Sequence, residues 1–156
     1  MVIEKTNVYL PSGRTKERIV VRPGKAVAIL PCEEDECVLI RQYRHAIGRW
    51  IYEAPAGTMD AGETPEATAR RELIEETGLA ATVIEPKGSI YTTPGYTDEV
   101  IYLFEASGLC PSDAHMPDED EMIEVVRVSR DEVHSMIEDG SIVDAKTICL
   151  AYRCLR

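Results

Sequence analysis

The sequence predicts an α/β fold in which helices cover both faces of a mixed β-sheet, an α/β/α sandwich preceded by an N-terminal β-hairpin. Short runs rich in Val and Ile recur along the chain, and segments with helix start signals lie among them. No repeat and no Gly- or Ser-rich linker divides the 156 residues, a length that can bury one core. We therefore expect residues 1–156 to form a single domain.

Alternating or continuous apolar runs predict the strands in chain order. The first two strands form a hairpin at residues 8–21 that turns at 11–13. Further strands are expected at 26–30, 37–43, 50–53, 83–91, 100–106 and 123–128. Mixed strands with helices between them are typical of the sandwich architecture.

The helix with the best-marked ends follows the strand expected at residues 50–53. Thr64 is a good N-cap, Pro65 fits the first helical position, and Gly78 suits the left-handed residue that ends a helix. Ala69 and Leu73 share a face that can pack on the sheet. The side chains on the rest of this helix are therefore held by a rigid, capped element.

Two more helices are expected near the C-terminus. The capping-box pattern from Ser129 to Glu132 predicts a helix that runs to Gly140. Asp144 is expected to cap a last helix, whose apolar face would consist of Ile148, Tyr152 and Leu155.

The charge balance is strongly acidic, with a formal net charge of −11. It argues against nucleic acid and anionic membranes as partners, because both require basic surface. No apolar run is long enough to span a bilayer, the start of the chain lacks a signal peptide, and the five cysteines lack zinc spacing. We therefore expect a cytoplasmic protein.

Three glutamates concentrate negative charge on the first helix. Glu72, Glu75 and Glu76 are spaced i, i+3 and i+4, so they project from one face and repel one another unless a cation lies among them. A solvated acidic face would explain the three glutamates alone. It would not explain why Gly57 and a helix start signal precede them.

The segment from residue 57 to residue 79 resembles the signature of the Nudix hydrolases, G-x5-E-x7-R-E-U-x-E-E-x-G-U, where U is an apolar residue. The matching positions are Gly57, Glu63, Arg71, Glu72, Leu73, Glu75, Glu76, Gly78 and Leu79. The resemblance implies the Nudix fold and the Mg²⁺-dependent hydrolysis of a diphosphate linked to another moiety, with Mn²⁺ as a possible substitute.

The same resemblance assigns roles to these residues. Glu72 and Glu76 would share a metal ion, Glu75 would complete or bridge a second ion, and the carbonyl of Ala56 would be a further ligand. Turnover should depend most on Glu76. Three supporting residues complete the set: Arg71 to orient the carboxylates, Glu63 to hold the loop against the helix, and Gly57 to give the backbone freedom.

Two further segments resemble the ADP-ribose pyrophosphatase subgroup. One contains Pro94, sixteen residues beyond Gly78, and Glu99; the other contains Arg44. The resemblance implies that Pro94 and Arg44 contribute to substrate binding, with Arg44 clamping a phosphate or a ribose, and that Glu99 binds the distal ribose hydroxyls. A surface charge on a strand is an equal alternative for Arg44.

The general base is expected in the acidic run at residues 118–124, with Glu119 as the first choice and Glu121 as the second. Taken alone, such a run is most often a solvated loop. For stacking on the adenine, the sequence does not choose among Tyr9, Tyr43 and Tyr96.

The implied activity is cleavage of ADP-ribose to AMP and ribose 5-phosphate. The alternative substrate is another nucleotide sugar or a dinucleotide, such as GDP-mannose or NADH. A minor alternative function is that of a sensor that binds ADP-ribose without hydrolysing it. Related enzymes also imply a homodimer in which residues 1–25 are exchanged between subunits.

Overall fold

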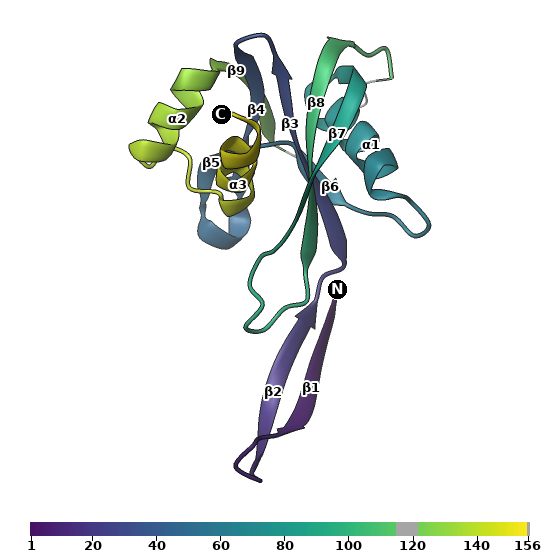
Figure 1. Ribbon diagram of the computed structural model, residues 1–156, viewed down its shortest axis with the longest axis vertical. Helices are drawn as coiled ribbons and strands as arrows, with labels where there is room; N and C mark the ends of the chain where they lie inside the picture. The colour runs from purple at the N-terminus through teal and green to yellow at the C-terminus, as the bar shows by residue number, and fades with distance from the viewer. Residues whose placement is uncertain (115–121, 156) are drawn as a thin grey trace.

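The computed structural model describes residues 1–114 and 122–155, and its elements follow the predicted order (Figure 1). The strands are β1 (Val2–Tyr9), β2 (Thr15–Arg22), β3 (Lys25–Glu33), β4 (Glu36–Arg44), β5 (Arg49–Glu53), β6 (Ala56–Thr58), β7 (Leu79–Tyr91), β8 (Val100–Pro111) and β9 (Ile123–Ser129). The helices are α1 (Pro65–Thr77), α2 (Arg130–Glu138) and α3 (Ala145–Cys154), with a short 3₁₀ turn at His45–Ile47.

A mixed sheet with the strand order β5-β4-β3-β8-β7 forms the centre of the fold. β3 runs parallel to β8, whereas it pairs with β4 and β6 in antiparallel fashion. The β3–β4 pairing is confined to Cys32 with Cys37 and Glu33 with Glu36, next to their turn. Beyond these residues β3 continues beside β6 and β8, and β4 continues beside β5 and β9.

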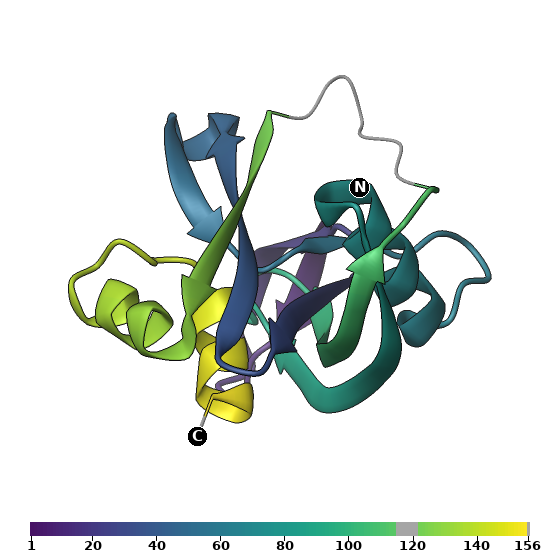
Figure 2. The same ribbon diagram turned by 90° about the horizontal axis from the view of Figure 1, so that it is seen from above.

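Helices cover both faces of the sheet, which confirms the predicted α/β/α sandwich (Figure 2). Side chains alternate along β3: Val27 and Ile29 pack in one cluster with Leu73 of α1, while Ala28 and Leu30 belong to the cluster that includes α2 and α3. All five are fully buried. Burial of a side chain such as Leu73 contributes roughly 1.5–3 kcal/mol, so α1 is firmly fixed to the sheet.

The ends of α1 are those predicted. The Thr64 hydroxyl accepts a hydrogen bond from the backbone N–H of Ala67 at 3.2 Å, and such a cap stabilises a helix by about 1 kcal/mol. Gly78 has φ 71° and donates its N–H to the carbonyl of Ile74. The capping box at Ser129 is also present, and α2 begins at the next residue.

The predicted apolar face of α3 is confirmed for Leu155, which is buried, and for Ile148, which packs against the core, but it is wrong for Tyr152. Tyr152 is 70% exposed, whereas Lys146, Thr147, Leu150 and Ala151 are the buried residues of this helix. The reason is a polar contact that hydrophobic periodicity does not reveal: the Thr147 hydroxyl accepts the backbone N–H of Ala54 at 2.7 Å. This bond ties the start of α3 to the residue after β5, and both Lys146 and Thr147 are buried there.

The hairpin β1–β2 projects away from the sheet as a separate two-stranded ribbon (Figure 1). It touches the loop before β8, where Val21 donates its N–H to the carbonyl of Tyr96 and Arg22 contacts Asp98. Apolar side chains along it remain exposed, including Ile3 at 69%. Within the described residues, no helix has the length and apolar character needed to cross a membrane.

Candidate functional site

Two of the three signature glutamates on α1 point toward β6. Glu72 is 9% exposed and Glu76 is 7% exposed, whereas Glu75 is only partly buried. One carboxylate oxygen of Glu76 accepts the backbone N–H of Ala56 at 2.8 Å. A glutamate is rarely buried to this extent without partners, so these two carboxylates are held against the strand rather than solvated. The solvated-face alternative therefore does not apply to Glu72 and Glu76.

Gly57 is required because of space, not because of backbone freedom. It is not among the glycines with a positive φ. A Cβ atom at this position would lie 1.9 Å from the carboxyl carbon of Glu72 and 2.0 Å from one of its oxygens. The absence of a side chain at Gly57 is what lets the Glu72 carboxylate lie against β6, and this corrects the reason inferred from the sequence.

Arg71 contacts three of the signature glutamates, Glu63, Glu72 and Glu75. Its Nη1 donates to Glu72 at 2.7 Å and to Glu75 at 2.8 Å. Nε and Nη2 donate to the two oxygens of Glu63, at 3.1 and 3.0 Å, and Nη2 also reaches the carbonyl of Thr58 at 3.1 Å. The hydrogen bond to Glu63 is the largest of several contacts that raise the pKa of Arg71 above its ordinary value. Arg71 therefore orients two signature carboxylates from a fixed position.

Glu63 ties the loop after β6 to the start of α1. Besides Arg71, it accepts the Thr68 hydroxyl at 2.8 Å and the backbone N–H of Asp60 at 3.1 Å. The hydrogen bonds from Arg71, Thr68 and Asp60, in that order, lower the pKa of Glu63 to about 2. These contacts join Glu63 to both the loop and the helix.

The residues present fit a divalent cation by their chemistry. Glu72, Glu76 and the carbonyl of Ala56 are hard oxygen donors, and the space at Gly57 is the cradle that one carboxylate occupies. Within residues 1–114 and 122–155, no three His, Cys, Asp or Glu side chains lie close enough together, in their present positions, to hold a metal ion. Glu72 accepts a hydrogen bond from Arg71, and Glu76 accepts one from the Ala56 N–H.

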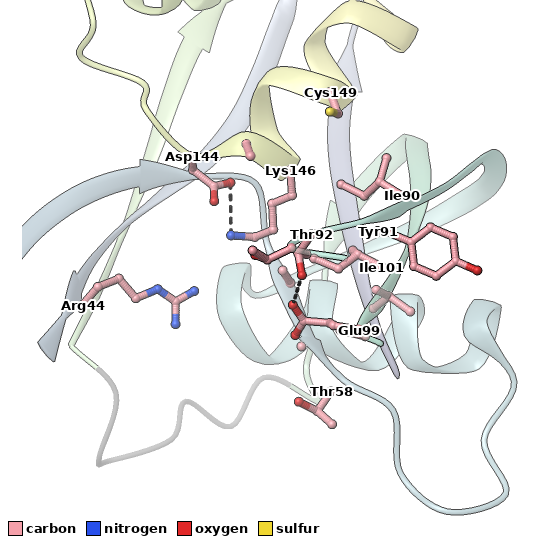
Figure 3. Close-up of a pocket in the computed structure, with 16 residues that line it drawn as sticks. Arg44, Thr58, Ile90, Tyr91, Thr92, Glu99, Ile101, Asp144, Lys146 and Cys149 are labelled. Atoms are coloured by element: carbon pink, nitrogen blue, oxygen red, sulfur yellow. Dashed lines mark hydrogen bonds and ion pairs between the residues drawn. The ribbon is translucent and has the colours of Figure 1, made fainter. Parts of the chain in front are cut away.

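A cavity of about 570 Å³ opens beside this helix face (Figure 3). Its walls come from β6, the loop after β7, the start of β8, the start of α3 and the end of β4. The polar lining includes Arg44, Thr58, Thr92, Glu99, Asp144 and Lys146. The cavity thus combines residues from both groups of strands that separate beyond the β3–β4 turn.

Arg44 lines this cavity, which supports the binding-site alternative over a plain surface charge. Its Nε and Nη2 donate to the two carboxylate oxygens of Glu53, at 2.6 and 3.1 Å. Burial acts to lower the pKa of Arg44, but Glu53, Glu76 and Asp144 together outweigh it, so the pKa lies above its ordinary value. Arg44 is therefore a fixed cation close to the signature helix.

Of the other two predicted substrate residues, Glu99 and Pro94, only Glu99 is in the cavity lining found in the described residues. Glu99 lines the cavity and accepts the Thr92 hydroxyl at 2.6 Å (Figure 3). Pro94 is exposed and is not part of the cavity lining found in the described residues, although its neighbours Thr92 and Thr93 are. Glu119 and Glu121 lie outside the described residues.

Three residues of the site were missed as site residues in the sequence. Glu53 was recognised as the end of a strand and as part of a segment that resembles the ADP-ribose pyrophosphatase subgroup, but it was given no role; Asp144 was treated only as a helix cap, and Lys146 was not singled out. Glu53 is 2% exposed and Lys146 is 9% exposed, and their ion pair joins residues 93 positions apart. The sequence signal was their position at element ends: Glu53 is the last residue of a predicted strand, and Lys146 follows the predicted cap Asp144 by two positions.

The fold and the carboxylate-bearing helix define a hydrolase that acts on diphosphate bonds. A model of the NUDIX domain matches residues 22–150. Over 143 residues the chain is 38% identical to the ADP-ribose pyrophosphatase of Bacillus subtilis (strain 168), which covers 90% of this chain and 77% of that protein. It is also 38% identical over 148 residues to the methanol dehydrogenase activator of Bacillus methanolicus, covering 94% and 80% respectively.

A solved structure agrees with these matches. The crystal structure of an ADP compounds hydrolase superposes with a TM-score of 0.85 at 26% identity, covering 96% of this chain and 82% of that one. The chain belongs to the Nudix hydrolase family. Members of this family generally use divalent metal ions.

Proposed function

We propose that this protein hydrolyses ADP-ribose to AMP and ribose 5-phosphate with Mg²⁺ bound at the signature helix. One water molecule adds across the phosphoanhydride bond, so that each product keeps one phosphate. The observation that carries the proposal is the cavity itself, because Arg44 and Glu99 line it together beside the β6 segment that contacts Glu72 and Glu76. The similarity to an ADP-ribose pyrophosphatase over most of the chain supports the choice of substrate.

Each described group has a proposed task. Glu72, Glu76 and the Ala56 carbonyl would hold Mg²⁺, with Glu75 completing or bridging a second ion. The metal supplies charge neutralisation on the diphosphate and a more acidic bound water. Arg44 has spare donors for a phosphate oxygen, and the Glu99 carboxylate suits the hydroxyls of the distal ribose.

The general base remains a proposal from the sequence. We infer that it comes from the acidic segment before β9, with Glu119 preferred to Glu121. Separate glutamate-to-glutamine substitutions at the two positions distinguish them. Substitution of the base should abolish the rise of the rate with pH that deprotonation of the base causes, whereas the other substitution should leave that rise unchanged. Equal pH–rate profiles for both variants and the unaltered protein would exclude both residues.

A substrate panel tests the proposed activity. With Mg²⁺, and separately with Mn²⁺, kcat/KM should be at least about tenfold higher for ADP-ribose than for GDP-mannose or NADH, because a pocket matched to one substrate gains at least 1.4 kcal/mol over the others. Comparable or faster turnover of GDP-mannose would overturn the choice of ADP-ribose. Tight binding of ADP-ribose without turnover would instead favour a sensor.

We also propose that the protein is a cytoplasmic homodimer in which the first 25 residues cross to the second subunit. Support comes from the hairpin β1–β2, which has exposed apolar side chains such as Ile3 and Ile19. An isolated two-stranded ribbon is at best marginally stable in water, so a partner surface would stabilise it. Light scattering at working concentration should give twice the mass of 17.4 kDa. A monomer would contradict the dimer.

A further inference from the structure

The wall of the cavity at Arg44 contains a series of ion-paired side chains, of which Glu53 and Lys146 are buried. The Glu53 carboxylate, 2% exposed, accepts two hydrogen bonds from Arg44 and a third from the Nζ of Lys146. Lys146 also contacts the Asp144 carboxylate at 3.1 Å (Figure 3). One buried carboxylate is thus shared by two cations, and the second cation is linked to a second carboxylate.

The charges of these four side chains balance only when Lys146 is present. Arg44 and Lys146 offset Glu53 and Asp144, so the four groups sum to zero. Asp144 is further offset by the N-terminus of α3, where it accepts the N–H and the hydroxyl of Thr147 at 3.0 and 2.6 Å. Without Lys146, the group would carry one net negative charge beside the site where a diphosphate would bind.

The ion pairs also leave N–H donors of Lys146 and Arg44 for a ligand. An ammonium has three N–H donors, and Glu53 and Asp144 use two of those on Lys146. Arg44 uses Nε and Nη2 for Glu53, and within the described residues its Nη1 makes no hydrogen bond. Both side chains line the cavity. Lys146 and Arg44 thus share the Glu53 carboxylate at the wall of the cavity.

We propose that Lys146 is a positioning residue that shares the Glu53 carboxylate with Arg44, keeps Arg44 oriented toward the phosphates of the substrate and keeps this group of four charges neutral. The proposal rests on the proposed diphosphate hydrolysis. It does not require Lys146 to take part in bond cleavage, so its effect is on substrate affinity rather than on the chemical step.

Lys146→Met should raise KM for ADP-ribose about tenfold and leave kcat within about threefold, because the methionine keeps the apolar stem and removes one charge. Lys146→Arg should keep KM close to that of the unaltered protein. Lys87→Met is the matched control, since Lys87 pairs with Glu85 and Glu105 and is not among the described residues that line the cavity. Its KM should not change.

Charge compensation separates positioning from a merely structural role. Asp144→Asn keeps the N-cap, because asparagine caps helices as well as aspartate does. Combined with Lys146→Met, it restores a neutral group and should recover most of the lost affinity. Asp144→Asn alone should lower KM or leave it unchanged. A purely structural lysine would give a double variant at least as impaired as the single one, and that result would overturn the proposal.

A binding measurement keeps this test independent of the identity of the substrate. Calorimetric titration with ADP in the presence of Ca²⁺ should reproduce the KM pattern: weaker binding for Lys146→Met, with recovery in the double variant. If the unaltered protein fails to turn over ADP-ribose, the proposed function is wrong, but the ADP titration still decides on Lys146. Equal ADP affinities for Lys146→Met and the unaltered protein would contradict the positioning role.

Discussion

Glu76→Gln should lower kcat for diphosphate hydrolysis about a thousandfold or more, equivalent to roughly 4 kcal/mol of lost transition-state stabilisation, while the fold remains intact. Glutamine keeps the size and one oxygen of the side chain, so the hydrogen bond from the Ala56 N–H can persist. What it removes is the negative charge that a divalent cation requires. Single-turnover and steady-state rates with Mg²⁺ measure the loss.

The matched control is Glu66→Gln, on the same helix. Glu66 lies in the first turn of α1, is exposed and forms an ion pair with Arg70 at 3.0 Å. Its loss should cost at most about 1 kcal/mol of stability and leave the rate unchanged. If Glu76→Gln retained full activity with an unchanged melting temperature, the metal assignment on α1 would be refuted.

Gly57→Ala should reduce kcat about a hundredfold and destabilise the fold by roughly 1–3 kcal/mol. The added Cβ would lie 1.9 Å from the carboxyl carbon of Glu72, a distance that forces either the carboxylate or β6 to move. Displacing Glu72 by about an ångström takes a proposed ligand away from its position. Kinetics together with thermal unfolding separate the two effects.

Gly95→Ala is the control for the alanine itself. An added Cβ at Gly95 would meet no atom within 4 Å, and its φ is not positive. Activity and stability should therefore both stay close to those of the unaltered protein. Equal kcat values for Gly57→Ala and Gly95→Ala would show that the Glu72 carboxylate does not need the space beside β6.

Local signals in the sequence predicted the framework of this site well. The ends of α1 follow from Thr64 and Gly78, because caps depend on residues a few positions apart. The buried face of α1 follows from Ala69 and Leu73 in the same way. The signature spacing likewise placed Glu72 and Glu76 on one rigid element.

Contacts between distant segments could not be predicted in this way. The short strand β6 has too few residues to show a pattern. Glycine is needed at Gly57 because of the side chain of Glu72, which lies fifteen residues later in the sequence. The Lys146–Glu53 pair joins α3 to β5, and the Thr147–Ala54 bond sets which face of α3 is buried. Hydrophobic periodicity favoured Tyr152 instead because it ranks polar residues as exposed.

Product analysis tests the central proposal most directly. The unaltered protein is incubated with ADP-ribose and Mg²⁺, and the products are identified by chromatography and phosphorus NMR. The account predicts AMP and ribose 5-phosphate in equal amounts, with neither formed by Glu76→Gln at a comparable rate. Absence of both products with Mg²⁺ and with Mn²⁺, or release of ADP with unphosphorylated ribose, would contradict it.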